Sequence, residues 1–453
     1  MIFTASLPKI KAFLRPAHLT ATTTALLVRL ITAFCRHPGR MSADAAAQAL
    51  RSQRRHRAQI ARFLARSHWS KDWSLLTDLA GLLLQQEARR DGTWLFLLDQ
   101  TYCGQQGRHA ENTFSRANYR PRVKQSARKQ KKHARRSCHG FVCGLLLTPS
   151  GLRIPCCRCY YTQQYCQAQQ QPYRKQTELA ATLIETLVVP PQACVVVLGD
   201  TAFEAQGIRV ACAARGFVWI VPINPERMLA GAAPRVRVRS LEKDWRAEDF
   251  QAVRLVPGEG TYAAQQRAAR CRVGPNRKVR TFWVHPERRA VHNVGDVLLV
   301  FSTNEPPQNG QAVRVQKVLM TNGAGWTAAE VVTLYDLRWQ IELFFKELKG
   351  TLGLAQYRFR KFAKVAGWVQ ACLVAFCYLE WYRWQRLHCP VASVPEKDWW
   401  RWQRSHGAAL HVTRQAEEHD LTRLWRGTCT KTGLKRLRRT LRQALPLGCT
   451  TGR

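Results

Sequence analysis

The order of strand-like and helix-like segments between residues 94 and 223 is the feature that most constrains what this chain can fold into. Five short runs are predicted to be strands: 94–98, 140–148, 152–162, 193–198 and 216–223. Two helices are predicted among the later strands, at 176–187 and 204–215. Hairpin-linked strands followed by alternating helices and strands indicate an α/β protein with a mixed (α+β) sheet covered by helices.

Changes in sequence character divide the chain into regions. Between 225 and 325, β-like runs alternate with Pro- and Gly-rich turns and indicate a β-rich insertion, with strands at 235–240, 279–285, 296–303 and 315–321. The predicted regions are a helical N-terminal region (1–90), a first core part (91–224), the insertion (225–325), a second core part (326–390) and a basic helical C-terminal region (391–453).

The helical N-terminal region has two interpretations that its sequence leaves equally open. Apolar residues recur there at helical spacing, and a basic stretch occupies 51–66. This pattern suits a small DNA-binding domain, and it equally suits a helical scaffold with a solvated basic face. The basic tail carries its own apolar stripe, formed by Leu434, Leu437, Leu441 and Leu445.

The charge balance narrows the class of partner. The chain has 71 Lys and Arg against 30 Asp and Glu, a formal charge of +41. Such a field attracts polyanions, and nucleic acid is the expected partner. A membrane surface is disfavoured because the charge is spread along the chain, and because the apolar stretches 25–34 and 365–382 contain polar residues that suit buried helices. The 16 cysteines occur without a visible secretory signal, which predicts a reduced, cytoplasmic protein.

Two isolated aspartates stand out against a chain with few acids. Asp99 follows the run 94–98, and Asp200 follows the run 193–198. Either residue alone is most simply a cap or turn residue. Two aspartates at matching places in one sheet, in a chain with no acid between Glu111 and Glu178, instead suggest a shared site.

A third acid is predicted on a long helix that begins at the capping box Thr327–Glu330 and runs to about Lys349. At about 100° per residue, four polar side chains share an arc of about 60° on this helix: Tyr335, Arg338, Glu342 and Lys349. An Arg338–Glu342 ion pair on a solvated stripe is the simpler interpretation of this helix taken alone. Three converging carboxylates, however, are the ligands that hard divalent cations prefer.

The four helix residues form the pattern Y-(2)-R-(3)-E-(6)-K, which resembles the signature of a large family of DDE-type insertion-sequence transposases. Leu98-Asp99-Gln100-Thr101 and Gly199-Asp200-Thr201-Ala202-Phe203 resemble the aspartate motifs of that family and occur in the expected order. The resemblance covers roughly residues 90–385. It implies a ribonuclease H-like core interrupted by a β-rich insertion.

The resemblance also implies the roles of individual residues. Asp99, Asp200 and Glu342 would be catalytic and would bind two Mg²⁺ or Mn²⁺ ions, whereas Tyr335, Arg338 and Lys349 would contact DNA phosphates. The basic, acid-free segment 116–136 would by default be a solvated charged loop, but its place beside this site favours contact with DNA phosphates. The residues expected to make this contact are Lys124, Arg128, Lys129, Lys131 and Lys132. Trp283 is a candidate for base stacking, although a buried strand tryptophan is the simpler interpretation.

The cysteines between 138 and 159 raise the alternative of a zinc site. Their spacing does not form two clean C-x₂-C pairs, and on strands a cysteine also serves as a small apolar residue. The members of this group are Cys138, Cys143, Cys156, Cys157 and Cys159.

The expected activity is cleavage of transposon ends and joining of their 3′-hydroxyls to target DNA. Double-stranded DNA is the expected partner, a homodimer is expected in the DNA complex, and the expected location is the nucleoid of a bacterial cytoplasm. A structure-specific nuclease of the same fold and a non-catalytic, domesticated DNA-binding derivative remain as alternatives.

Overall fold

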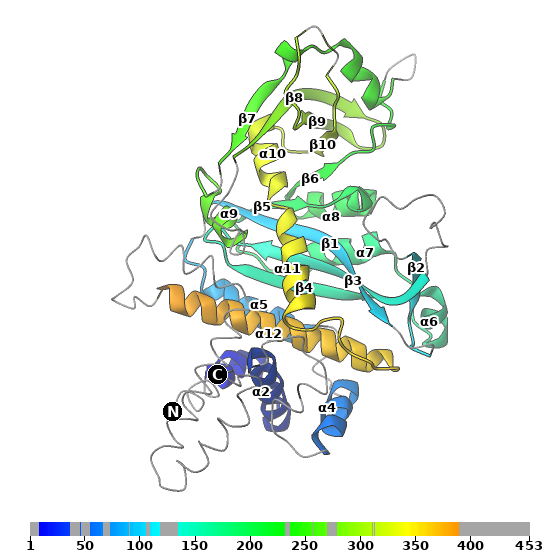
Figure 1. The fold of residues 1–453 in the computed structure, drawn as a ribbon, viewed down its shortest axis with the longest axis vertical. Helices are drawn as coiled ribbons and strands as arrows, with labels where there is room; N and C mark the ends of the chain where they lie inside the picture. Colours follow the sequence, from blue (N-terminus) through cyan, green and yellow to red (C-terminus); the bar gives the residue numbers. More distant parts are fainter. Residues whose placement is uncertain are drawn as a thin grey trace, which may run out of the picture.

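A ten-stranded sheet forms the spine of the computed structural model (Figure 1). The structure describes residues 9–36, 46, 55–66, 73–89, 91–105, 109–117, 135–231, 236–256, 258–269, 279–309, 311 and 313–388. The strands follow the order β2-β3-β1-β5-β6-β10-β9-β8-β7, and β4 pairs with β3 off this path. The basic tail, 391–453, lies outside the described residues.

The core of the sheet has the strand order of the ribonuclease H-like fold, β4-β3-β1-β5-β6. Strand β1 is antiparallel to β3 and parallel to β5, and β5 is parallel to β6. The fold class and the five core strands predicted from the sequence are therefore confirmed. The bounds are β1 Thr93–Gln105, β3 Arg135–Leu147, β4 Arg153–Tyr160, β5 Cys194–Leu198 and β6 Val218–Pro222, with a short edge strand, β2 Phe114–Ala117, that the sequence did not reveal.

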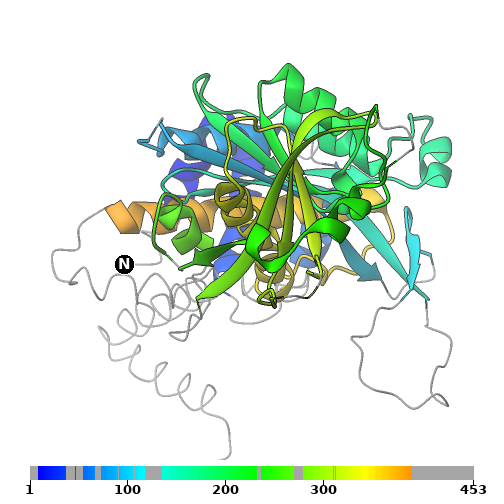
Figure 2. The ribbon, with the colours of Figure 1, turned by 90° about the horizontal axis from the view of Figure 1, so that it is seen from above.

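Helices cover both faces of this core sheet. Figures 1 and 2 show that α7 and α8 lie against one face, whereas α11 crosses the other. The predicted helices at 176–187 and 204–215 correspond to α7 and α8. The bounds are α6 Gln163–Ala168, α7 Gln176–Glu185, η4 Thr201–Phe203, α8 Gln206–Ala214, α10 Ala328–Asp336, α11 Trp339–Gly350 and α12 Phe362–His388.

The strands between 225 and 325 extend the core sheet. β10 pairs antiparallel with both β6 and β9, so the hydrogen-bonded ladder continues from the core into this segment. The expected strand at 235–240 is wrong: Arg237 forms an isolated bridge, and a 3₁₀ helix begins at Val238. The bounds are η5 Val238–Asp244, η6 Ala247–Asp249, β7 Gln251–Leu255, α9 Ala263–Ala269, β8 Arg280–Val291, β9 Gly295–Thr303 and β10 Lys317–Thr321.

The N-terminal helices pack on α12 on the side of the core away from the insertion (Figure 1). Their bounds are η1 Arg15–Ala17, α2 Ala21–Arg36, α4 Arg55–Arg66 and α5 Ser74–Gln85. Gly367 lets α4 approach closely, because a Cβ there would lie 2.6 Å from the carbonyl oxygen of Leu64. Phe362–Gln385 of α12 is long and apolar enough to cross a membrane, but 83% of its most apolar window is buried inside the protein, as in a core helix.

A buried charge network ties α11 to β4 and α12. Arg153 Nη1 lies 3.2 Å from Glu347 Oε2, and Arg153 Nη2 lies 2.5 Å from Glu380 Oε1. Arg383 pairs with the other oxygen of Glu380 at 2.6 Å. Burial acts to raise the pKa of Glu380, but the two arginine charges hold it at about 2. The network balances two carboxylates with two guanidinium groups, which makes their burial tolerable.

Candidate active site

The register of the sheet brings Asp99 and Asp200 to corresponding places beyond the paired part of two neighbouring strands. The parallel pairing of β1 with β5 ends at Leu97 and Leu198, and each aspartate lies two residues further along its strand direction. Adjacent strands are about 4.8 Å apart, so the two carboxyl groups start from neighbouring points at one edge of the sheet. Strand β1 itself continues to Gln105, so the expectation that Asp99 ends its strand is wrong. Only the pairing of β1 with β5 ends near Asp99, at Leu97.

Asp200 lies at a tight turn from β5 into η4. Its Oδ1 accepts a hydrogen bond from Ala202 N at 2.9 Å, so it caps the 3₁₀ helix as well. Gly199 permits this turn because a Cβ at that position would lie 2.9 Å from Phe203 Cβ. The capping interpretation of this aspartate is therefore realised, but it uses one carboxylate oxygen only.

The long helix predicted from Thr327 to about Lys349 is broken. Helix α10 ends at Asp336, α11 begins at Trp339, and the junction is held by short-range bonds such as Arg338 N to Tyr335 O at 3.0 Å. The expectation that four polar residues share one face of a single helix is therefore wrong. The sequence offers neither Pro nor Gly here, so the usual signal for a helix break is missing.

Arg338 lies at this break and joins two of the three acids. Its Nη2 donates a hydrogen bond to Glu342 Oε1 at 3.0 Å, and its Nη1 lies 3.5 Å from Asp99 Oδ2. The i,i+4 ion pair that the sequence offered as the simpler interpretation is therefore present. It is part of a bridge between α11 and β1, and the Arg338 and Asp99 side chains are each only 15% exposed.

The electrostatics of Asp99 place it within interaction range of both other acids, Asp200 and Glu342. Burial raises the pKa of Asp99 to about 6, and the negative charges of Asp200 and Glu342 add to the rise. A hydrogen bond from Gln100 N to Asp99 Oδ1, at 2.7 Å, and the charge of Arg338 act in the opposite direction. An acid with a strongly raised pKa beside two further acids is a frequent property of functional sites.

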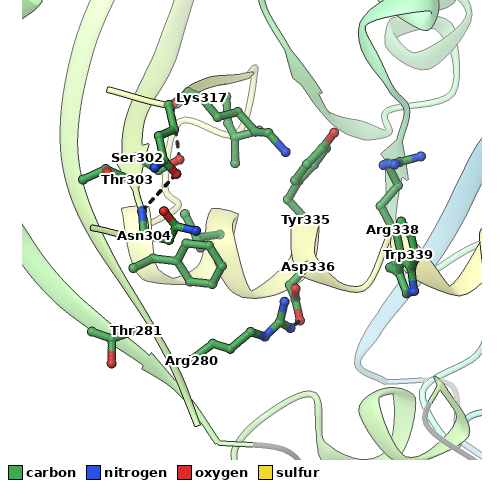
Figure 3. A pocket seen from close by; sticks show the side chains of 14 residues that line it. Arg280, Thr281, Ser302, Thr303, Asn304, Lys317, Tyr335, Asp336, Arg338 and Trp339 are labelled. Atoms are coloured by element: carbon green, nitrogen blue, oxygen red, sulfur yellow. Dashed lines mark hydrogen bonds and ion pairs between the residues drawn. The ribbon is translucent and has the colours of Figure 1, made fainter. Parts of the chain in front are cut away.

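A cavity of about 760 Å³ opens beside this junction, between β8, β9, β10 and α10 (Figure 3). The Lys317 ammonium lies 5.0 Å from the ring centre of Tyr335, and Arg280 pairs with Asp336. Trp339 is 57% exposed at the rim. The cavity thus combines cationic, aromatic and polar groups, including Ser302, Thr303, Asn304 and Gln316. Lys317 and Arg280 were not predicted from the sequence, because nothing in their local pattern distinguishes them from other strand residues.

The surroundings of the cavity shift the pKa of two side chains that line it, Tyr335 and Lys317. Burial raises the pKa of Tyr335 to about 12, so the phenol keeps its proton at neutral pH. Burial lowers the pKa of Lys317, and the charge of Arg338 lowers it further. Lys349 lies further along α11, about 10 Å from Glu342 at the helical rise, and its Nζ is 5.8 Å from the ring centre of Phe345.

Other residues singled out from the sequence contribute differently. Lys124, Arg128, Lys129, Lys131 and Lys132 lie outside the described residues. Trp283 is half-buried on β8. The five cysteines considered as zinc ligands lie on β3 and β4, where Cys143 Sγ is 3.4 Å from Cys157 Sγ, and burial raises the thiol pKa of Cys157.

Asp99, Asp200 and Glu342 have the carboxylate oxygens that a hard divalent cation binds. As placed, no three Asp, Glu, His or Cys side chains among the described residues are close enough to hold a metal ion together. Arg338 instead lies within pairing distance of two of the acids. The three carboxylates therefore have the chemistry to bind a cation, and two of them, Asp99 and Glu342, pair with the guanidinium of Arg338.

A family model described as "Transposase DDE domain" matches residues 121–379, which is more than half of the chain. The chain therefore belongs to the DDE transposase family, whose members act on DNA and generally use divalent metal ions. The match includes Asp200 and Glu342 and begins after Asp99. No curated protein matches the sequence.

Proposed function

We propose that this protein is a DNA transposase that cleaves transposon ends and joins their 3′-hydroxyls to target DNA. The observation that carries the proposal is that Asp99, from the first core strand, lies within electrostatic range of two acids from later parts of the chain, Asp200 and Glu342. Asp99 and Asp200 each lie two residues beyond the last pair that joins β1 to β5, and Glu342 is linked to Asp99 through Arg338. Membership of the DDE transposase family supports the same activity.

Asp99, Asp200 and Glu342 are the proposed ligands of two Mg²⁺ or Mn²⁺ ions. When bound, such ions activate the attacking hydroxyl or water and stabilise the leaving oxygen of an in-line displacement. The protein contributes the placement of the carboxylates. One oxygen of Asp200 accepts a hydrogen bond within its turn and the second is proposed to bind the ions, and the Glu342 side chain is 36% exposed.

The residues around the cavity are proposed to hold the DNA end. Arg338 is suited to grip a phosphate as a planar fork, and Lys349 to attract one as a point charge. Tyr335, which keeps its proton, can donate a hydrogen bond from the cavity wall. Lys124, Arg128, Lys129, Lys131 and Lys132 are proposed to contact phosphates as well, and two copies of the chain are proposed to act together because two ends must be joined.

Replacement of Glu342 by alanine tests the triad. We expect Glu342→Ala to abolish joining of a labelled 3′-hydroxyl end to a target plasmid in the presence of Mg²⁺, while DNA binding and the melting curve stay close to those of the unaltered protein. Glu185→Ala, which removes an exposed carboxylate at the end of α7, is the matched control and should retain activity. Full joining by the Glu342 variant would refute the triad.

The same assay separates the proposed activity from its alternatives. A structure-specific nuclease would cleave the labelled DNA without joining it to the plasmid. A non-catalytic derivative would bind the DNA and leave it intact at every Mg²⁺ concentration. The DNA on either side of the gene offers a second test, because short inverted repeats that bracket it are expected for a transposase.

A further inference from the structure

Arg338 contacts both the acids and the cavity, to which the proposed function gives separate roles. Its guanidinium is within pairing distance of Asp99 and Glu342, two of the three acids. The same side chain lines the cavity beside Tyr335, and its guanidinium carbon lies 6.0 Å from the Tyr335 ring centre (Figure 3). Arg338 therefore stands between the acids and the space proposed for the DNA end.

The break between α10 and α11 gives Arg338 this position. Hydrogen bonds from residue i to residue i−3, including Leu337 N to Leu334 O at 2.9 Å and Gln340 N to Leu337 O at 3.1 Å, tighten the chain at the junction. A stretch of 3₁₀-type bonding inside a helical segment often marks a functional hinge. Here it lies next to the one residue that pairs with acids on both α11 and β1 among those the structure describes.

The Arg338 guanidinium is better explained as a group that occupies the place of a bound cation than as one half of a surface ion pair. The negative charges of Asp200 and Glu342 repel that of Asp99, and the positive guanidinium of Arg338, which is only 15% exposed, offsets this repulsion. A cation that binds Asp99 and Glu342 competes for the same oxygens that Arg338 contacts. Binding of the cation and pairing of Arg338 therefore exclude each other at those oxygens.

We propose that Arg338 occupies the cation position between Asp99 and Glu342 in the metal-free protein, and that metal binding displaces its guanidinium toward the cavity. The inference rests on the proposed function of the acids and adds a mode of regulation. A displaced Arg338 gains a phosphate of the DNA end as its new partner. Metal and DNA then strengthen each other's binding, and this coupling is reciprocal by thermodynamic necessity.

Direct measurement of Mn²⁺ binding tests the displacement without any activity assay. The full-length protein is titrated with Mn²⁺ in the absence of DNA, and the free ion is followed by electron paramagnetic resonance. Removal of the competing positive charge should tighten binding about tenfold in Arg338→Gln. Arg338→Lys keeps the charge but loses the two-pronged contact, so about threefold tighter binding is expected.

Two further variants identify the source of the effect. Lys346→Gln removes an exposed positive charge on the same helix, one turn beyond Glu342, and should change Mn²⁺ affinity less than about twofold. Glu342→Gln should lose the Mn²⁺ site, which tests the proposed triad itself. Circular dichroism and melting curves establish that each variant is folded, and Arg338→Lys carries the test if the Gln variant is unfolded.

The outcomes separate the two hypotheses. Tighter binding in both Arg338 variants, with Lys346→Gln unchanged, supports the displacement. Equal or weaker binding in the Arg338 variants overturns it and leaves the triad intact, because Arg338 would then organise the acids rather than compete for them. An equal gain in Lys346→Gln also overturns it, since the effect would be general electrostatics. A Mn²⁺ site that persists in Glu342→Gln, or no Mn²⁺ binding by any form, overturns the triad and the displacement together.

Discussion

Asp99 on β1 and Asp200 in the turn after β5 each lie two residues beyond the last pair that joins these two parallel strands. This arrangement brings two like charges together at one sheet edge, and Asp99 is also largely buried. Its pKa is raised to about 6 from an ordinary value of 3.8. The folded state therefore binds a proton at Asp99 more readily than the unfolded state does, and stability falls as the pH rises from about 3.8 to about 6.

Asp99→Asn is expected to stabilise the protein at neutral pH, because it removes the penalised charge. The shift corresponds to about 1–3 kcal/mol at pH 7.5 and to less than about 1 kcal/mol near pH 4, where the unaltered side chain is already protonated when folded. Melting temperatures in a chelating buffer across this pH range measure the effect. Asp78→Asn, an exposed change on α5, should show no such pH dependence. Equal melting curves for Asp99→Asn and the unaltered protein at pH 7.5 would contradict the expectation.

The sheet and the acids could be predicted from the sequence because each leaves a local pattern. Apolar runs gave the five core strands, and the isolation of Asp99 and Asp200 in those runs marked them. The helix break at Leu337–Arg338 could not be predicted, since no Pro or Gly marks it and only tertiary contacts select the short-range bonding. Lys317 and Arg280 lie close to α10 because the folded sheet places β10 and β8 beside that helix, and no local sequence pattern marks such proximity.

Arg153 is expected to be essential for stability although it lies away from the candidate active site. Arg153→Met removes the cation that pairs with the buried Glu347 and one of the two cations that pair with Glu380. Loss of one partner from a buried ion pair costs about 3–5 kcal/mol. Chemical denaturation measures the change in the free energy of unfolding. Arg158→Met, on the same strand and only half-buried, is the matched control and should cost less than about 1 kcal/mol.

The contact of α4 with α12 leads to a prediction about two glycines in helices. Gly367→Ala places a methyl group against the backbone of Leu64, so α4 must shift and a loss of about 1–3 kcal/mol is expected. At Gly81, which lies on α5, an added Cβ would have no neighbouring atom within 4 Å. Gly81→Ala should therefore be neutral or stabilising by up to about 1 kcal/mol. Melting curves compare the variants, and limited proteolysis of the N-terminal helices should be faster in Gly367→Ala alone. Equal effects of the two changes would show that α4 tolerates the added methyl group.

Lys317 is expected to contribute to DNA binding as a phosphate contact. Burial and the nearby Arg338 lower its pKa, so an arriving phosphate would relieve a repulsion that the free protein sustains. Lys317→Met should weaken binding to a short duplex at all sequences and reduce the slope of log affinity against log salt by about 1. Fluorescence anisotropy at several salt concentrations measures both quantities. Lys175→Met removes an exposed lysine at the start of α7 and should leave the affinity nearly unchanged. An unchanged salt slope in Lys317→Met would assign this lysine to the packing of Tyr335 instead of to the DNA contact.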